Sequence, residues 1–179
     1  MLYKSETAVI GDLLTQQFDM SKHPLQIEAV LIIDDNITLR DFLANVFSTV
    51  FLVDTIYTAT NGAEGLKIFQ QQKHHIVLII LDIEMPIMNG PQTYKKLRQI
   101  APHVRVIVSS ALNYVDAKVQ FDEQTLPVYL QKPYTLETLL KIVYSEFATI
   151  RDMLTKSQLS QALMTWDDDG GQQGNIFAG

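Results

Sequence analysis

One uninterrupted apolar run constrains the fold more than any other part of the chain. Residues 76–81 are all Val, Ile or Leu, and the run stops at the carboxylate of Asp82. A run of this length, closed by turn-forming residues, is typical of a parallel strand buried on both faces. Ligand sites in open α/β sheets lie beyond the carboxyl ends of such strands. We therefore expect Asp82 to lie at a functional site.

A second, earlier apolar run ends in the same way. Residues 29–33 read Ala-Val-Leu-Ile-Ile, and the carboxylates of Asp34 and Asp35 follow them directly. Asn36 then precedes apolar residues spaced at the period of a helix. Residues 37–48 are therefore expected to form a helix that this asparagine caps.

Strand and helix patterns alternate through the rest of the chain. Further strands are expected at 54–59, 104–108 and 127–130, the first of them at an exposed edge because polar and apolar residues mix there. Further helices are expected at 63–72, from residue 90 and from residue 135, with a helix or a partly irregular segment at 112–121. Five strand–helix units with short connections predict an α/β protein with a doubly wound, five-stranded parallel sheet and helices on both faces.

The main domain is expected to cover residues 28–150. Residues 1–27 carry one helical apolar stripe and are expected to form a helical extension that either docks on this domain or contacts a partner. Residues 151–179 are expected to form a C-terminal helical extension and a disordered acidic, Gly- and Gln-rich tail. No output domain is recognisable after the main domain, which favours a stand-alone protein, although a truncation of a longer one stays open. The spacing of the last helix fits a homodimer seam as well as packing on its own sheet.

Composition narrows the class of protein. The chain has 179 residues and no cysteine, which excludes a disulfide framework and thiol zinc sites and fits a cytoplasmic protein. No apolar run approaches the roughly 18 residues that a membrane span needs. A formal net charge of −6 argues against nucleic acid as a partner.

Four of the expected strands end at polar side chains that can act together. Asp34 and Asp35 follow the first strand, Asp82 the third, Ser110 the fourth and Lys132 the fifth. Because the carboxyl ends of parallel strands share one edge of a sheet, the five side chains can meet. Three carboxylates repel one another unless a cation neutralises them, and oxygen ligands in this number suit Mg²⁺. Each residue alone could simply cap a helix, but the set together predicts phosphoryl transfer to the carboxylate of Asp82.

The residues at these strand ends resemble the conserved positions of a known protein family. Residues 28–150 resemble the receiver domain of two-component response regulators, the CheY-like superfamily. The family's acidic pair falls on Asp34 and Asp35, and its phosphoacceptor falls on Asp82. The remaining matches are Met85-Pro86, Met88-Asn89-Gly90, Ser110-Ala111, the aromatic switch Tyr129, and Lys132-Pro133-Tyr134, whose Lys-Pro bond is commonly cis in the family.

The resemblance implies a flavodoxin-like strand order, 2-1-3-4-5, and a phosphorelay function. A histidine kinase or a histidine phosphotransfer protein would donate its phosphoryl group to Asp82. Mg²⁺ would be held by the side chains of Asp35 and Asp82, by Asp34 through water, and by the backbone carbonyl of Glu84. Apart from self-phosphorylation and autodephosphorylation, the resemblance implies no enzyme activity.

The resemblance also implies a switch. On phosphorylation Ser110 would move toward the phosphoryl oxygens, and Tyr129 would turn into the vacated space. The face formed by the fourth helix, the fifth strand and the final helix would then select a downstream protein partner.

Two departures from the family pattern affect these expectations. The usual Gly-Ala turn before the fifth strand is replaced by residues 122–127, which bears on the shape of the signalling face. Glu84 places a carboxylate two residues after Asp82, at a position that tunes phosphoryl lifetime in the family. We expect this charge to alter the approach of water to the phosphoryl group.

Two other functions are alternatives to the predicted phosphorelay function. The first is a receiver-fold adaptor that acts by protein contact without being phosphorylated, which the loss of an acidic residue or of the lysine would favour; none is lost. The second is a phosphatase of the haloacid type, which also uses an aspartate nucleophile. That family needs a second aspartate two residues later, where this chain has Glu84.

Overall fold

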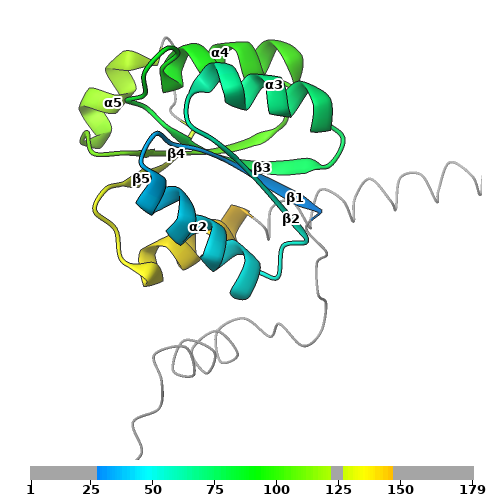
Figure 1. The fold of residues 1–179 in the computed structure, drawn as a ribbon. Helices are drawn as coiled ribbons and strands as arrows, with labels where there is room; N and C mark the ends of the chain where they lie inside the picture. Colours follow the sequence, from blue (N-terminus) through cyan, green and yellow to red (C-terminus); the bar gives the residue numbers. More distant parts are fainter. Residues whose placement is uncertain (1–27, 122–126, 147–179) are drawn as a thin grey trace, which may run out of the picture. The chain divides into compact units, whose positions relative to one another are not determined.

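Five parallel strands and their connecting helices form the fold in the computed structural model, which describes residues 28–121 and 127–146 (Figure 1). The strands are β1 (Ala29–Ile33), β2 (Thr55–Ala59), β3 (Ile76–Asp82), β4 (Arg105–Ser110) and β5 (Val128–Gln131). The helices are α2 (Ile37–Thr49), α3 (Gly62–Gln72), α4 (Gly90–Ile100) and α5 (Tyr114–Gln120), and residues 136–146 are also helical. The strand order β2-β1-β3-β4-β5 confirms the predicted doubly wound, flavodoxin-like sheet.

The chain divides into two compact units, Met1–Val104 and Arg105–Gly179. In the first unit β1 pairs in parallel with β2 on one side and with β3 on the other. In the second unit β4 pairs in parallel with β5. The structure does not describe the extensions predicted for residues 1–27 and 151–179. It also leaves out residues 122–126, which make up most of the segment that replaces the family's Gly-Ala turn.

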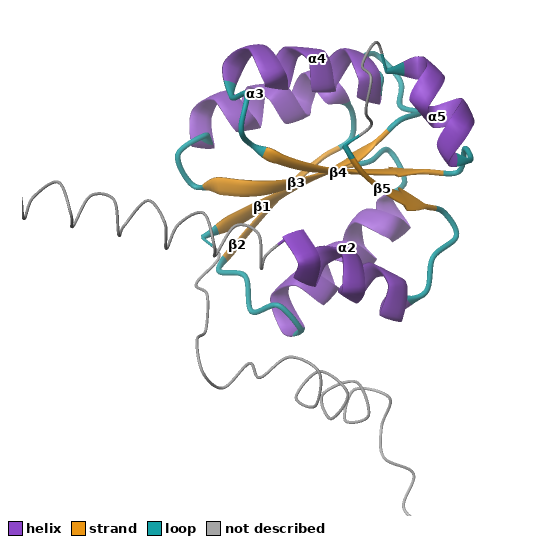
Figure 2. Cartoon of the chain, turned by 180° about the vertical axis from the view of Figure 1, so that it is seen from behind, coloured by secondary structure: helices purple, strands orange, loops and turns teal. Residues whose placement is uncertain are grey.

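Burial explains why the two apolar runs form β1 and β3, which are interior strands of the sheet. All five residues of β1 are buried, as are six of the seven in β3, because helices cover both faces of these strands. Figure 2 shows α2 on one face and α3 and α4 on the other. β2 lies at the edge and is mostly exposed or half-buried, as its mixed sequence predicted.

An asparagine caps the N-terminus of each of the helices α2, α3, α4 and α5. Asn36, Asn61, Asn89 and Asn113 are the N-caps of α2, α3, α4 and α5, and each side chain accepts a hydrogen bond from a backbone N–H three residues later. The predicted cap at Asn36 is confirmed. Because Asn61 caps α3, that helix begins at Gly62, one residue earlier than expected.

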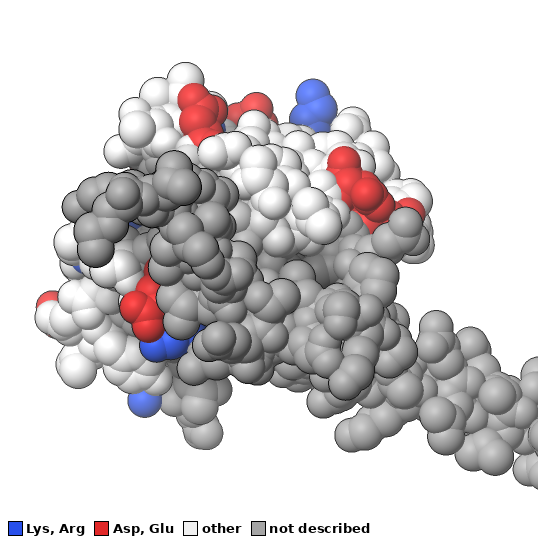
Figure 3. Space-filling model, turned by 90° about the horizontal axis from the view of Figure 1, so that it is seen from below, with Lys and Arg blue, Asp and Glu red and all other residues white. Residues whose placement is uncertain are grey.

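Within the described residues no helix combines the length and the apolar character that crossing a bilayer requires. On the face drawn in Figure 3, the Lys and Arg side chains of the described residues lie apart from one another.

Candidate functional site: an acidic cluster at the ends of β1 and β3

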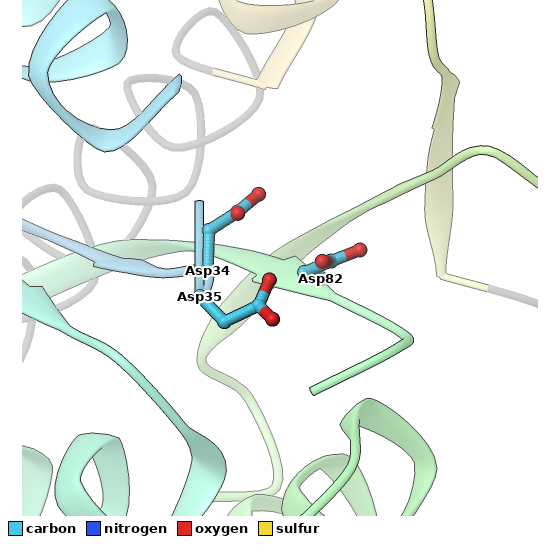
Figure 4. A group of neighbouring side chains, drawn as sticks. All are labelled: Asp34, Asp35 and Asp82. Atoms are coloured by element: carbon cyan, nitrogen blue, oxygen red, sulfur yellow. The ribbon is translucent and has the colours of Figure 1, made fainter. Parts of the chain in front are cut away.

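Three aspartates converge where β1 and β3 end. One carboxylate oxygen from each of Asp34, Asp35 and Asp82 lies within 4.8 Å of the others. The strand register explains the meeting, because Ile33 of β1 pairs with Leu81 of β3, and the next residues along are Asp34 and Asp82. Figure 4 shows the three carboxylates pointing in the same general direction. The predicted convergence of the acidic residues is therefore found.

The burial of the three carboxylates differs. Asp34 is 2% exposed and Asp82 6% exposed, whereas Asp35 lies at the surface. Backbone amides hold the two buried side chains: Asn36 N–H donates to Asp34 Oδ1 at 2.8 Å, and Ile83 N–H donates to Asp82 Oδ1 at 2.8 Å. Both carboxylates are thus oriented by the chain itself, while the exposed Asp35 gives the cluster access to solvent.

The donor set fits Mg²⁺. This ion takes oxygen ligands at about 2.1 Å in octahedral geometry, so two oxygens on opposite sides of it are about 4.2 Å apart. Carboxylate oxygens that already lie within 4.8 Å of one another need only small movements to reach that spacing. Two or three carboxylates also match the hard, anionic ligands that the ion prefers.

The loop after Asp82 is fixed by two close backbone contacts. Gly90 N–H donates to Ile83 O at 2.8 Å, and a Cβ placed on Gly90 would lie 2.3 Å from the carbonyl oxygen of Asp82. Gly62 N–H donates to Met88 O at 3.1 Å, which ties the start of α3 to the same loop. The Met-Pro-x-Met-Asn-Gly motif therefore has a physical role: its glycine lets α4 begin directly against the backbone of Asp82.

Glu84 lies in that loop, and its side chain is exposed. A charge that alters the approach of water to Asp82 must itself be exposed to solvent, as Glu84 is. The effect itself stays a prediction.

Ser110 and Tyr129 of the second unit bind the same residue. Leu112 N–H donates to Ser110 Oγ at 3.2 Å, and the hydroxyl of Tyr129 donates a short hydrogen bond to the carbonyl of Leu112. The Tyr129 ring is half-buried and meets the ring of Tyr114 edge-on, with centroids 5.8 Å apart. Burial is the main cause that raises the pKa of Tyr129, so its hydroxyl stays a donor at neutral pH.

Lys132 follows β5 directly. Its backbone N–H donates to Ser110 O at 2.7 Å, its side chain is half-buried, and the Lys132-Pro133 bond is cis, as the resemblance implied. The convergence of Ser110 and Lys132 with the acidic cluster stays a prediction.

The sequence patterns missed two contacts near these residues. Arg40 Nη1 donates to the backbone carbonyl of Asp34 at 2.6 Å, and Leu112 joins Ser110 to Tyr129. The first had a weak signal, an arginine in the opening turn of a helix that follows an acidic pair. The second had none, because Leu112 acts through its backbone.

The strand order and the aspartates at the carboxyl ends of β1 and β3 place the chain among the flavodoxin-like α/β proteins. The family described as the response regulator receiver domain matches residues 30–144, and the chain belongs to this family.

Individual relatives agree with that assignment. The nitrate/nitrite response regulator protein NarL of Escherichia coli strain K12 is 30% identical over 134 residues, which covers 75% of this chain and 60% of that protein. A protein-glutamate methylesterase/protein-glutamine glutaminase of Hahella chejuensis is 36% identical over 93 residues, which covers 52% of this chain and 23% of that protein. The chain therefore spans 23% of the length of one of these curated relatives and 60% of the other.

Solved structures share the fold. A chain of the CheX-CheY-BeF3-Mg²⁺ complex from Borrelia burgdorferi is 28% identical and superposes with a TM-score of 0.58, covering 67% of this chain and 89% of that chain. That complex contains Mg²⁺ and BeF3. What it shares with the present chain is the receiver fold.

Proposed function

We propose that this receiver accepts a phosphoryl group on Asp82 and passes the signal on by protein contact. The observation that carries the proposal is the acidic cluster: Asp34, Asp35 and Asp82 come from two strands, and their oxygens lie within 4.8 Å of one another. Receivers are signalling domains of two-component systems, and the predicted donor is a phosphohistidine of a kinase or of a phosphotransfer protein.

The chemistry requires a nucleophile held in one orientation. A carboxylate oxygen of Asp82 attacks phosphorus, a P–O bond forms, and the P–N bond to the donor imidazole breaks. The electron pair leaves with the imidazole nitrogen, which takes a proton from solvent. The hydrogen bond from Ile83 N–H to Asp82 Oδ1 holds the carboxylate in place for this attack.

Mg²⁺, when bound, neutralises charge that builds up on the phosphoryl oxygens. Asp35 and Asp82 would hold it directly, Asp34 through water, and the backbone carbonyl of Glu84 would complete the protein ligands. Lys132 would pair with a phosphoryl oxygen and Ser110 would donate a hydrogen bond to another. Water later attacks phosphorus, the P–O bond to Asp82 breaks, and inorganic phosphate leaves the restored carboxylate.

The output belongs to the second unit. If Ser110 Oγ turned to the phosphoryl group, its hydrogen bond from the N–H of Leu112 would break. The carbonyl of the same leucine accepts the hydrogen bond from the Tyr129 hydroxyl, so the change would reach Tyr129. Such a change would spread to α5, where Tyr114, Val115 and Val119 are 48%, 68% and 81% exposed. We propose that the surface of α5, β5 and residues 136–146 is where a downstream protein tells the two states apart.

Incubation with acetyl phosphate and Mg²⁺, followed by intact mass, tests the proposal. The expected result is the gain of one phosphoryl group that chelation of the metal prevents. The matched control is Asp54→Asn, which removes an exposed carboxylate from the loop before β2 and should leave the gain unchanged. No mass gain in the parent protein would favour the phosphorylation-independent adaptor, and turnover of a small phosphate ester would favour a phosphatase.

A further inference from the structure

Arg40 contacts the acidic cluster without belonging to it. This residue lies in the first turn of α2, and its side chain reaches back six residues to the end of β1. There Nη1 donates to the carbonyl oxygen of Asp34 at 2.6 Å, a short and charge-assisted hydrogen bond. The side chain is half-buried, so this bond is only partly screened by water.

The backbone of Asp34 is therefore held at both of its polar groups. Its N–H donates to the carbonyl of Ala59 at the end of β2, at 3.1 Å, and its carbonyl accepts from Arg40. The next residue, Asp35, lies beyond the end of β1, and its side chain is exposed. The direction in which Asp35 leaves β1 then depends on how firmly the preceding peptide group is fixed.

A carboxylate near Arg40 offsets its charge. Glu64 accepts from the N–H and the hydroxyl of Thr60, both at 2.7 Å. Those two hydrogen bonds are the leading causes that lower the pKa of Glu64, and attraction to Arg40 adds to them. The positive charge of Arg40 is thus partly balanced before it can repel a cation at the aspartates.

We propose that Arg40 is a positioning residue for Mg²⁺, which fixes the Asp34 peptide so that Asp34 and Asp35 present their oxygens to the ion. The inference rests on the proposed metal site and adds a residue to it. Arginine suits the task because its guanidinium is always charged and its donors are held in one plane. Residues that orient metal ligands in this way typically contribute about 10- to 100-fold to metal affinity.

The test measures Mg²⁺ affinity without any phosphodonor. The amide resonances of the aspartates are followed through a Mg²⁺ titration, and thermal unfolding is recorded at each Mg²⁺ concentration, since a ligand that binds the folded state raises the unfolding temperature. Arg40→Met keeps the aliphatic stem but removes the charge and the donors. We expect it to weaken Mg²⁺ binding about tenfold, and Arg40→Lys to recover part of that loss.

Arg98→Met is the matched control. Arg98 also donates from a helix to backbone carbonyls, those of Pro102 and Val104, at 3.1 and 2.6 Å. It lies near the C-terminal end of α4, whereas the acidic cluster precedes that helix. This variant should lower the unfolding temperature in the absence of metal and leave Mg²⁺ affinity unchanged.

The outcomes separate the two proposals. If the parent binds Mg²⁺ and Arg40→Met binds it equally well, with only a lower unfolding temperature, Arg40 is a structural residue and the inference is overturned while the proposed function stands. Tighter binding by Arg40→Met would show that charge repulsion dominates, which also overturns it. If the parent binds no Mg²⁺ at the aspartates, the metal site and the role of Arg40 fall together.

Discussion

The hydroxyl of Tyr129 donates to the backbone carbonyl of Leu112, and the N–H of that same leucine donates to Ser110 Oγ. The two residues that the resemblance implies as a switch thus both bind one residue of the loop between β4 and α5, and the Tyr129 hydroxyl also lies 3.5 Å from the carbonyl oxygen of Ser110. Loss of the Ser110 bond would free one side of this leucine while the other stays held. Substitution of either residue therefore tests its part in the proposed switch.

Tyr129→Phe removes the donor and keeps the ring. We expect the free energy of unfolding to fall by about 1 kcal/mol, the usual net value of a hydrogen bond. The rate of phosphorylation by acetyl phosphate should be nearly unchanged, because the proposed chemistry does not use this hydroxyl. Urea unfolding and intact mass measure the two effects.

Tyr57→Phe, at another half-buried strand tyrosine, is the control for the change of residue type. A strong loss of phosphorylation in Tyr129→Phe alone would contradict the division between chemistry and switch.

Gly90→Ala tests how closely α4 approaches the acceptor. The new Cβ would lie 2.3 Å from Asp82 O and 2.7 Å from Ile83 Cα, and both of these are backbone atoms that cannot turn away. We expect a loss of about 1–3 kcal/mol in the free energy of unfolding, together with slower phosphorylation because the loop must shift. Denaturant unfolding and the initial rate of mass gain check these effects.

Gly65→Ala is the comparison for that variant. Its Cβ would meet the end of the Ile33 side chain at 2.4 Å, which is more easily displaced than backbone, and alanine is the better helix former. Its stability loss should be smaller and its phosphorylation rate close to that of the parent. Equal rates for Gly90→Ala and the parent would show that the glycine does not position Asp82.

We predict that the contribution of Glu64 to the free energy of unfolding is sensitive to acid. The hydrogen bonds from Thr60 lower its pKa in the folded state, so its contribution is complete above the ordinary carboxyl value and is lost as the pH falls through the lowered one. Glu64→Gln should therefore be less stable than the parent near pH 7, and the difference should shrink as the pH is lowered below about 4. Unfolding curves recorded from pH 3 to pH 7 measure this; a difference that stays constant across the range would contradict it.

Much of the fold followed from pattern alone. The runs at β1 and β3 could be recognised because strands buried on both faces need uninterrupted apolar residues, and β2 because an edge strand does not. The meeting of Asp34 with Asp82 followed from parallel strands sharing one edge.

Contacts that depend on the length of a side chain or on the backbone could not be predicted in this way. The reach of Arg40 to the carbonyl of Asp34 depends on a rotamer, and the fit of Gly90 against Asp82 depends on tenths of an ångström. The hydrogen bonds of Leu112 leave no trace in residue type, since any residue has an N–H and a carbonyl there.

The most direct test of the account is to locate the phosphoryl group. After incubation with acetyl phosphate and Mg²⁺, borohydride reduction converts a phosphorylated aspartate to homoserine, and peptide mapping shows where this residue lies. We predict homoserine at position 82 of the parent and none in Asp82→Asn. Homoserine at another aspartate of the parent, or none anywhere, would contradict it.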